Sequence, residues 1–219
     1  MPDLNENYPD SYNITFETWD KVAAAYQEYF MDLDLYDDTY DAFCGLIEKR
    51  NPGIFEIGCG PGNITKYILS KRPDFRIEAI DISPNMIKLA EENNPEVDAG
   101  VMDCREIGKL TATYDAIMCG FCLPYLAKAD VARLIKDCSD LLNRGGIIYL
   151  STIEGSYEKS GYETGRDGQN KMFIYYYQAD FLLEELQANH FEIIEQKRKS
   201  FSKKDGTIQT HLILIAKKK

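Results

Sequence analysis

The chain has 219 residues, of which 44% are hydrophobic and 28% charged, and its formal net charge is −11. This length and apolar content suffice for one sizeable core and exclude a small scaffold held together by disulfides. An acidic chain repels phosphate backbones, so we expect no nucleic-acid partner. The basic segment from Lys197 to the end carries eight Lys or Arg and one Asp, and we interpret it as a solvated edge.

The cysteines and the first ten residues indicate the cellular compartment in which we expect the protein. All six cysteines fall within patterns typical of buried strands and helices, so we expect free thiols in a reducing compartment. The first ten residues lack the basic and apolar regions of a signal peptide, and no apolar run reaches the length of a membrane span. We therefore expect a soluble, cytoplasmic protein with no membrane partner. The oligomeric state stays open.

The first fifty residues predict two helices, because aromatic and aliphatic residues recur near helical spacing over 16–30 and 35–49. The pattern changes at Gly53. We expect residues 1–50 to form a helical cap and residues 51–219 to form the core domain.

After Gly53, short apolar runs alternate with amphipathic helices. The predicted strands are GIFEIG, FRIEAID, VDAGVM, YDAIMCG, IIYLSTI, FEIIEQK and TIQTHLILIA, and the predicted helices begin near Asn63, Pro84, Val131 and Phe181. Gly145 and Gly146 are expected to end the third of these helices. The segment SFSKKDG leaves no room for a crossover helix, which predicts an antiparallel hairpin. The sequence therefore predicts an α/β fold: a doubly wound, Rossmann-like, seven-stranded and mostly parallel sheet with an antiparallel last strand.

The stretch EIGCGPGNIT, residues 56–65, follows the first predicted strand. In such sheets the loop after the first strand is the usual cofactor contact, and glycines let the backbone approach a ligand closely. A dinucleotide-binding fingerprint requires a glycine where Asn63 stands, and the stretch has no Gly-Lys-Ser/Thr of a nucleotide triphosphate loop.

The loop EIGCGPGNIT, the later stretches IEAIDISPNMI and GVMDCREI and the closing hairpin all occur in this chain in order. In these features, residues 50–217 resemble the class I S-adenosylmethionine-dependent methyltransferases. Their first motif is acidic-x-G-x-G-x-G at the same strand-to-helix turn. The resemblance implies S-adenosylmethionine as cofactor and, by position, a set of cofactor contacts. These are Glu56, Gly58, Cys59, Gly60, Gly62, Asp81, Ile82, Met86, Asp103, Cys104, Cys119 and Phe121.

The resemblance also implies roles for the three carboxylates. Asp81 would hold both ribose hydroxyls, Asp103 with the Cys104 backbone would recognise the adenine edge, and Glu56 would lie near the ammonium group of the methionine part. The competing interpretation of each carboxylate is a helix cap or a surface charge.

The stretch CGFCLPYL, residues 119–126, is the expected neighbourhood of the chemistry. It lacks the Asn/Asp-Pro-Pro-aromatic motif common in methyltransferases that modify nucleic-acid bases, and Pro124 stands where many small-molecule members carry a histidine. The catalytic residue is therefore unknown, and Tyr125 is a candidate for positioning the acceptor, with aromatic packing as the alternative. We expect no metal site, because neither a second cysteine pair nor a nearby histidine completes a zinc set. His190 and His211 are expected to be structural or exposed.

Substrate contacts are expected from two added segments, the cap and the long polar stretch 156–171, which has the composition of a mobile active-site loop. The candidates are Trp19, Tyr26 and Phe30 from the cap and Tyr157, Tyr162 and Arg166 from the loop. The following MFIYYYQ is compatible with an extra strand.

These patterns predict methyl transfer to a small molecule by in-line displacement, with oxygen, nitrogen or carbon as acceptor unresolved. Two alternatives remain open. One is an NAD(P)-dependent oxidoreductase, and the other is a catalytically silent module that binds S-adenosylmethionine and engages a protein partner through its acidic N-terminal segment.

Overall fold

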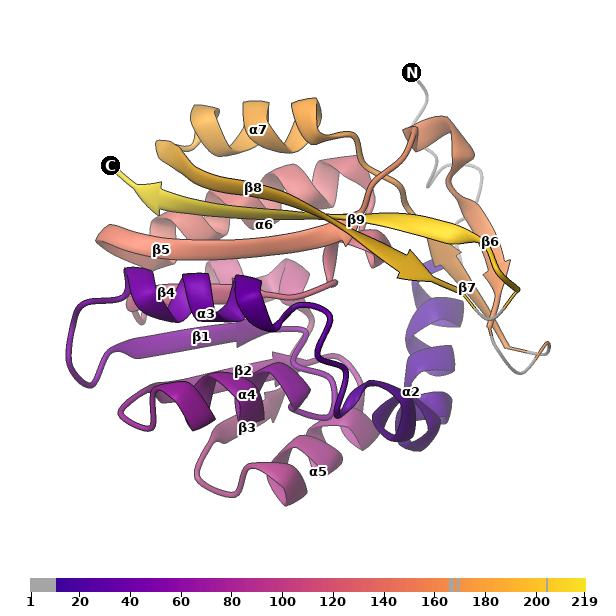
Figure 1. Ribbon diagram of the computed structural model, residues 1–219, viewed down its shortest axis with the longest axis horizontal. Helices are drawn as coiled ribbons and strands as arrows, with labels where there is room; N and C mark the ends of the chain where they lie inside the picture. The colour runs from indigo at the N-terminus through magenta and orange to yellow at the C-terminus, as the bar shows by residue number, and fades with distance from the viewer. Residues whose placement is uncertain (1–10, 166–167, 169, 204) are drawn as a thin grey trace.

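The computed structural model describes residues 11–165, 168, 170–203 and 205–219. Its main sheet has seven strands in the order β3-β2-β1-β4-β5-β9-β8 (Figure 1). The strands are β1 (Gly53–Ile57), β2 (Arg76–Asp81), β3 (Asp98–Val101), β4 (Tyr114–Cys119), β5 (Leu142–Ile153), β8 (Phe191–Ser202) and β9 (Ile208–Lys218). Strand β9 lies between β5 and β8 and runs antiparallel to both, whereas the other pairs are parallel. The predicted fold class, including the closing hairpin, is confirmed.

Helices cover both faces of this sheet (Figure 1). They are α2 (Ser11–Phe30), α3 (Asp37–Leu46), α4 (Asn63–Lys71), α5 (Pro84–Asn93), α6 (Lys128–Leu141) and α7 (Ala179–Ala188). Buried residues of α3, α4 and α5 share one core with one face of the sheet, and those of α6 and α7 share another core with the opposite face. In β9, Leu212 and Leu214 belong to one core and Ile213 and Ile215 to the other. The continuous apolar run of this strand follows from burial on both faces.

Helix α6 ends differently from the prediction. It ends at Leu141, and β5 begins at Leu142, so Gly145 and Gly146 lie inside a strand instead of ending the helix. The Nζ of Lys218 donates to the carbonyl oxygens of Ser139 and Leu142, at 2.5 and 2.8 Å. A lysine from the end of β9 therefore pairs with helix-end carbonyls that the backbone N–H groups of a glycine turn would otherwise satisfy.

The stretch 156–171 is not the open loop that its composition suggests. It contains a short 3-10 helix, η3 (Tyr157–Lys159), and strand β6 (Gly161–Thr164), which pairs antiparallel with β7 (Lys171–Ile174). The extra strand that MFIYYYQ allowed is therefore present as β7. The predicted contact Arg166 lies outside the described residues.

Helix α2 lies at the carboxyl edge of the parallel strands, beside the β6–β7 hairpin (Figure 1). The Oγ1 of Thr18 donates to the carbonyl oxygen of Lys171 at 2.7 Å, and the Oγ1 of Thr15 accepts from the backbone N–H of Phe173 at 2.9 Å. Two threonines thus extend the hydrogen bonding of β7 onto the helix.

The other side of α2 caps helix α5. The Oδ1 of Asp20 accepts from the Ser83 hydroxyl at 2.7 Å and from the Asn85 backbone N–H at 2.9 Å. The Ser83 Oγ also accepts from the Met86 N–H at 3.0 Å, as the local N-cap. Helix α5 therefore has one cap from its own sequence and a second from α2.

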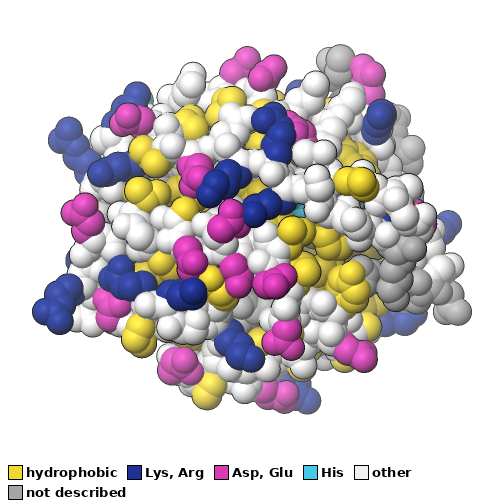
Figure 2. Space-filling model, viewed as in Figure 1, with side chains coloured by type: hydrophobic (Ala, Val, Ile, Leu, Met, Phe, Trp, Pro, Cys, Tyr) yellow, Lys and Arg dark blue, Asp and Glu magenta, His cyan; other side chains and the backbone are white. Residues whose placement is uncertain are grey.

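The division into a cap over 1–50 and a core over 51–219 stays a prediction. Within the described residues, α2 lies over the sheet edge, whereas α3 packs in the helical layer with the Tyr40 ring 5.6 Å from that of Tyr149. Figure 2 shows charged side chains of both signs mixed over one face, and hydrophobic side chains gathered where β8, β9 and α2 meet. None of the described helices has the length and apolar character to cross a membrane.

We expect Asp20→Ala to lower the free energy of unfolding by about 1–2 kcal/mol, because the α5 cap and the bridge to α2 are lost together. Urea denaturation measures the change. Glu17→Ala removes an exposed carboxylate from the same helix and serves as the matched control. Equal stability of the two variants would contradict a bridging role for Asp20.

Candidate functional site

The glycine loop after β1 is tied to the end of β2. The backbone N–H groups of Gly58 and Cys59 both donate to the carbonyl oxygen of Ile80, at 2.8 and 3.0 Å. Gly58 has φ +69, and a Cβ there would lie 3.1 Å from the Cβ of Cys122. Gly62 has φ +81, and a Cβ there would meet the Asn94 amide nitrogen at 2.2 Å. The loop therefore needs glycine for its backbone conformation and for close packing.

Asp81 ends β2 directly beside this loop. Its Oδ2 accepts from the Gly60 N–H at 3.0 Å, and its Oδ1 accepts from the Ser83 N–H at 2.9 Å. Burial raises the pKa of Asp81, and the backbone hydrogen bonds oppose that shift. Each carboxylate oxygen keeps a further lone pair, so the group can accept two more hydrogen bonds from a ligand.

Glu56 lies in β1 and is 1% exposed. Its Oε2 accepts from the Thr65 hydroxyl at 2.6 Å, whereas its Oε1 has no partner among the described residues. Burial raises the pKa of Glu56 to about 7, against the hydrogen bond from Thr65, and the nearby Asp81 adds to the rise. Glu56 does not line either cavity described below. Its unpartnered oxygen is suited to a cationic group approaching the loop.

Asp103 and Cys104 follow β3, at the start of the 3-10 helix η1 (Cys104–Lys109). The Nε of Arg105 donates to both Asp103 oxygens, at 3.0 and 2.9 Å. Burial raises the pKa of Asp103, but the hydrogen bonds from Arg105 outweigh it, and the net shift is downward. The Arg105 guanidinium lies 4.2 Å from the centre of the Tyr12 ring. The carboxylate is thus ionised and already paired within the chain.

Most of the predicted cofactor residues surround one cavity of about 100 Å³. Its lining includes Gly58, Gly60, Asp81, Ile82, Met86, Asp103, Cys104 and Phe121. Cys59 lines the neighbouring cavity. Cys119 ends β4 inside the core and lines neither cavity, whereas Gly120 and Phe121, just beyond the strand, line both. Gly62 is likewise absent from both linings, and its role is the turn into α4.

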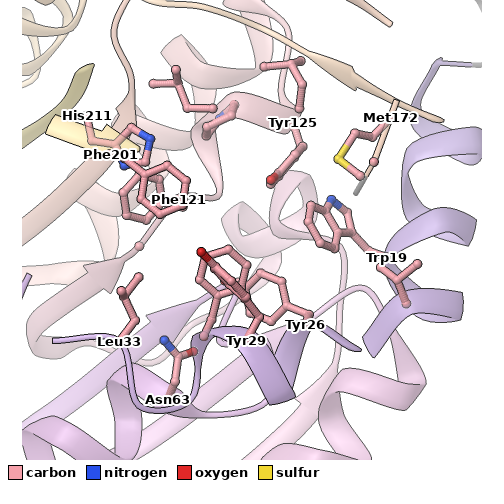
Figure 3. A pocket seen from close by; sticks show the side chains of 18 of the residues that line it. Trp19, Tyr26, Tyr29, Leu33, Asn63, Phe121, Tyr125, Met172, Phe201 and His211 are labelled. Carbon is pink, nitrogen blue, oxygen red and sulfur yellow. The ribbon is translucent and has the colours of Figure 1, made fainter. Parts of the chain in front are cut away.

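A larger cavity of about 350 Å³ adjoins the first one (Figure 3). Six residues line both cavities: Trp19, Tyr26, Gly58, Gly120, Phe121 and Tyr125. The predicted contacts Trp19, Tyr26 and Phe30 therefore lie where α2 borders this space. Its remaining wall is rich in aromatic rings, and Figure 3 shows Tyr29, Phe201 and His211 around it. The shared residues make a common boundary between two adjacent binding spaces.

Tyr125 belongs to that boundary and packs edge-on against Trp19, with ring centroids 5.2 Å apart. Burial raises the pKa of Tyr125 well above its usual value. Its phenol therefore stays neutral and is suited to hydrogen bonding or packing, not to removing a proton.

Tyr157 and Tyr162 do not line either cavity. The Tyr157 ring packs against Tyr175 and Tyr177, and Tyr162 lies against Phe173 at 39% exposure. Strand alternation in β6 turns Glu163 toward the larger cavity instead.

His211 is the residue that the sequence analysis missed. It is 6% exposed, lines the larger cavity and lies at the amino-terminal end of β9. Because β9 is antiparallel, this end lies beside the carboxyl end of β5, where Ile153 pairs with His211. His211 could therefore have been found from the predicted hairpin. The start of an antiparallel last strand lies at the carboxyl edge of the parallel strands, where ligands bind in such sheets.

The cysteines of CGFCLPYL do not form a metal site. The Cys122 Sγ lies 3.6 Å from the Cys104 Sγ, and all six cysteines are free. Across the part of the chain that the structure describes, no three His, Cys, Asp or Glu side chains are grouped to hold a metal ion.

The comparison with protein families matches residues 54–146 to a model described as a methyltransferase domain. This match spans the glycine loop, Asp81, Asp103 and Tyr125. A protein of Invertebrate iridescent virus 6 named as a methyltransferase is 34% identical over 46% of this chain and 37% of its own length. A tRNA N(3)-methylcytidine methyltransferase of Schizosaccharomyces pombe is 26% identical over 69% of this chain and 65% of its own. The chain thus spans about a third and just under two thirds of these relatives.

Solved structures share the fold. An S-adenosylmethionine-dependent methyltransferase from Methanosarcina mazei has a TM-score of 0.70 and 20% identity, covering 85% of this chain and 99% of that one. The N-methyltransferase NodS from Bradyrhizobium japonicum, in complex with S-adenosyl-L-homocysteine, has a TM-score of 0.67 and 14% identity, covering 93% and 97%. At these identities the likeness concerns the fold alone.

The raised pKa of Glu56 predicts a pH-dependent stability difference. A buried carboxyl whose folded pKa exceeds its unfolded value stabilises the fold below about pH 4.5, and this contribution is lost as the pH rises toward 7. Glu56→Gln, which mimics the neutral carboxyl, should therefore gain about 2–3 kcal/mol relative to the original chain between pH 4.5 and pH 8.

Urea denaturation at the two pH values gives this difference, with Glu17→Gln at an exposed position as the control. A constant gap between the Glu56→Gln variant and the original chain would show that Glu56 is ionised in the folded protein throughout.

Proposed function

We propose that this chain, which belongs to the class I S-adenosylmethionine-dependent methyltransferases, transfers a methyl group from S-adenosylmethionine to a small-molecule acceptor in the larger cavity. The observation that carries the proposal is the boundary shared by the two cavities. An in-line displacement needs donor and acceptor to meet with water excluded. Two adjacent spaces that share six lining residues suit that requirement.

The residues around the smaller cavity fit the cofactor. When bound, S-adenosylmethionine supplies a methyl group on a positively charged sulfur, which is an excellent leaving group. Asp81 has the free lone pairs to hold two ribose hydroxyls, and Ile82 and Met86 are placed to pack against the adenine ring. Glu56, whose Oε1 has no partner among the described residues, would attract the ammonium group of the methionine part electrostatically across the glycine loop. Asp103 would recognise the adenine amino group only by sharing its oxygens with Arg105.

The chain's own contribution to the chemistry is alignment and exclusion of water. Trp19 and Tyr26 from α2 and Tyr125 from the 3-10 helix η2 (Leu123–Tyr125) border both cavities. Aromatic walls offer the acceptor apolar contact and keep the reaction space dry. A base is required only for an acceptor that must lose a proton.

A small acceptor is favoured over RNA. The Schizosaccharomyces pombe relative is a tRNA methyltransferase by name, but this chain carries a net charge of −11, which disfavours a polyanion. The larger cavity, at about 350 Å³, has the size of a pocket for a small ligand. The oxidoreductase alternative loses support, because the family model that covers the glycine loop is a methyltransferase domain.

Asp81→Ala should weaken S-adenosylmethionine binding by about 100-fold or more, because two hydrogen bonds to a carboxylate are lost. Calorimetric titration with S-adenosylmethionine, S-adenosylhomocysteine and NADH measures this. Asp81→Asn tests the charge with the shape kept, and Asp98→Ala, at an exposed position of β3, should bind like the original chain. Binding of NADH alone would overturn the assignment of the cofactor cavity.

Methyl transfer itself is tested with methyl-labelled S-adenosylmethionine against a library of small aromatic and aliphatic acceptors and, in parallel, unmodified tRNA. We expect label in a small molecule, and loss of that transfer in Asp81→Ala. Label in tRNA alone would replace the proposed acceptor class. Tight cofactor binding without transfer to any acceptor would favour the silent binding module.

A further inference from the structure

We infer that the larger cavity binds an apolar, ring-sized acceptor through oxygen atoms that receive hydrogen bonds from the imidazole of His211 and the indole of Trp19. The inference rests on the proposed function, in which this cavity holds the acceptor. It adds the chemical class of the acceptor and two residues that select it.

Two buried nitrogens of this cavity lack hydrogen-bond partners. They are Nε2 of His211 and Nε1 of Trp19, and no described residue forms a hydrogen bond with either. His211 comes from β9 and Trp19 from α2, and Figure 3 shows them on different sides of the same space. Buried polar groups are nearly always paired in native proteins. A ligand in this cavity would supply both missing partners.

The other nitrogen of His211 is fixed by Tyr36. The Tyr36 hydroxyl lies 2.6 Å from Nδ1, and it has no other hydrogen-bond partner within the described chain. If the hydroxyl donates to Nδ1, only the Nε2–H of the imidazole is left unpaired. If Nδ1–H donates instead, both the Tyr36 proton and the Nε2 lone pair are left unpaired. Each unpaired buried group costs about 1–3 kcal/mol, so the first arrangement is favoured and Nε2 carries the proton.

Aromatic rings hold this imidazole neutral and oriented. The Phe201 ring stacks on it with centroids 5.0 Å apart, and the Phe121 ring meets it edge-on at 4.8 Å. Burial, together with the charge of Lys203, lowers the pKa of His211 to about 4. At neutral pH the cavity therefore presents an uncharged N–H donor.

The ligand class follows from two unpartnered donors in an aromatic space. Glu163 and Lys203 also line this cavity, but they pair with each other at 3.1 Å, and Glu163 accepts a second hydrogen bond from Tyr176. An indole N–H can only donate, and the favoured His211 tautomer donates as well. A carbonyl, carboxylate or phenolate oxygen satisfies such groups, whereas an ammonium group would place donor against donor. The aromatic walls and the volume of about 350 Å³ suit a flat apolar body beside these oxygens.

The position of His211 puts the proposed oxygen-binding site close to the cofactor cavity. Phe121, which His211 contacts edge-on, lines both cavities. An oxygen bound to Nε2 would therefore lie close to the shared boundary, where donor and acceptor have to meet.

The first experiment determines the protonation of His211 without any ligand. Two-dimensional ¹H–¹⁵N NMR of the histidine rings, assigned with His211→Phe, distinguishes the two neutral tautomers and the cation. We expect the proton on Nε2 at pH 7, and a shift toward a mixture of tautomers in Tyr36→Phe. A proton on Nδ1, or a cationic ring, would overturn the inference.

The second experiment measures the preference for an oxygen acceptor with two probes, 4-fluoroacetophenone and 4-fluorotoluene, by ¹⁹F NMR titration. The ketone should bind about tenfold more tightly than the toluene, since hydrogen bonds to the carbonyl are added to the same ring contact. His211→Phe and Trp19→Phe keep an aromatic ring and remove the N–H. At least one of them should abolish the preference, because the single carbonyl oxygen reaches one of two nitrogens that lie on different sides of the cavity. His190→Asn, an exposed histidine with φ +67, should retain it.

Failure of this inference and failure of the proposed function give different results. Equal binding of the two probes to the original chain would overturn the inference, whether or not S-adenosylmethionine binds. A ketone preference that survives in both variants would also overturn it. In a third outcome, the original chain binds the ketone more tightly, a variant binds both probes equally, and the original chain does not bind S-adenosylmethionine. That outcome would support the oxygen site and overturn the methyltransferase proposal.

Discussion

The position of helix α2 is the constraint on which both binding spaces depend. Hydrogen bonds from Thr15 and Thr18 join it to β7, and Asp20 joins it to α5. Trp19, between the last two of these residues, and Tyr26, two turns farther on, then border both cavities. Without the two attachments, the carboxyl edge of the sheet would be an open groove. The polar contacts on the flanks of the helix thus determine where its aromatic residues close the site.

The electrostatics beneath the glycine loop oppose stability and suit a cationic ligand. Glu56 is buried and Asp81 is partly buried, and the charge of Asp81 adds to the raised pKa of Glu56. Backbone N–H groups stabilise Asp81, but nothing in the described chain pairs with Glu56 Oε1. Buried carboxylates without a cation are costly. Under the proposed assignment, a positively charged cofactor would offset part of that cost, so cofactor affinity and the lower stability of the empty protein would have one cause.

Local sequence was enough to bring the predicted cofactor residues together. The grouping of the glycine loop, Asp81 and Asp103 around one cavity could be predicted because each follows its strand directly, and parallel strands bring their carboxyl ends to one edge. The acceptor half depends on contacts between distant segments. We expected His211 to be structural or exposed because it lies within the last strand, and its place in the cavity wall follows only once the antiparallel register puts it beside Ile153. The prediction that Tyr157 and Tyr162 border the substrate was not met for a similar reason, because neither lines a cavity. Composition predicts a loop over 156–171, but it does not predict which side of a β-hairpin faces the cavity.

The antiparallel place of β9 has a consequence for synthesis on the ribosome. The predicted cofactor contacts lie between Glu56 and Phe121, whereas the larger cavity combines Trp19 and Tyr36 with Phe201 and His211. A nascent chain that has emerged through β5 already contains those predicted contacts, but it lacks the strand that carries His211. Bringing β9 to the space that α2 borders closes a loop spanning most of the chain, which has a large entropy cost. The larger cavity can therefore be complete only after the last strand has joined the sheet.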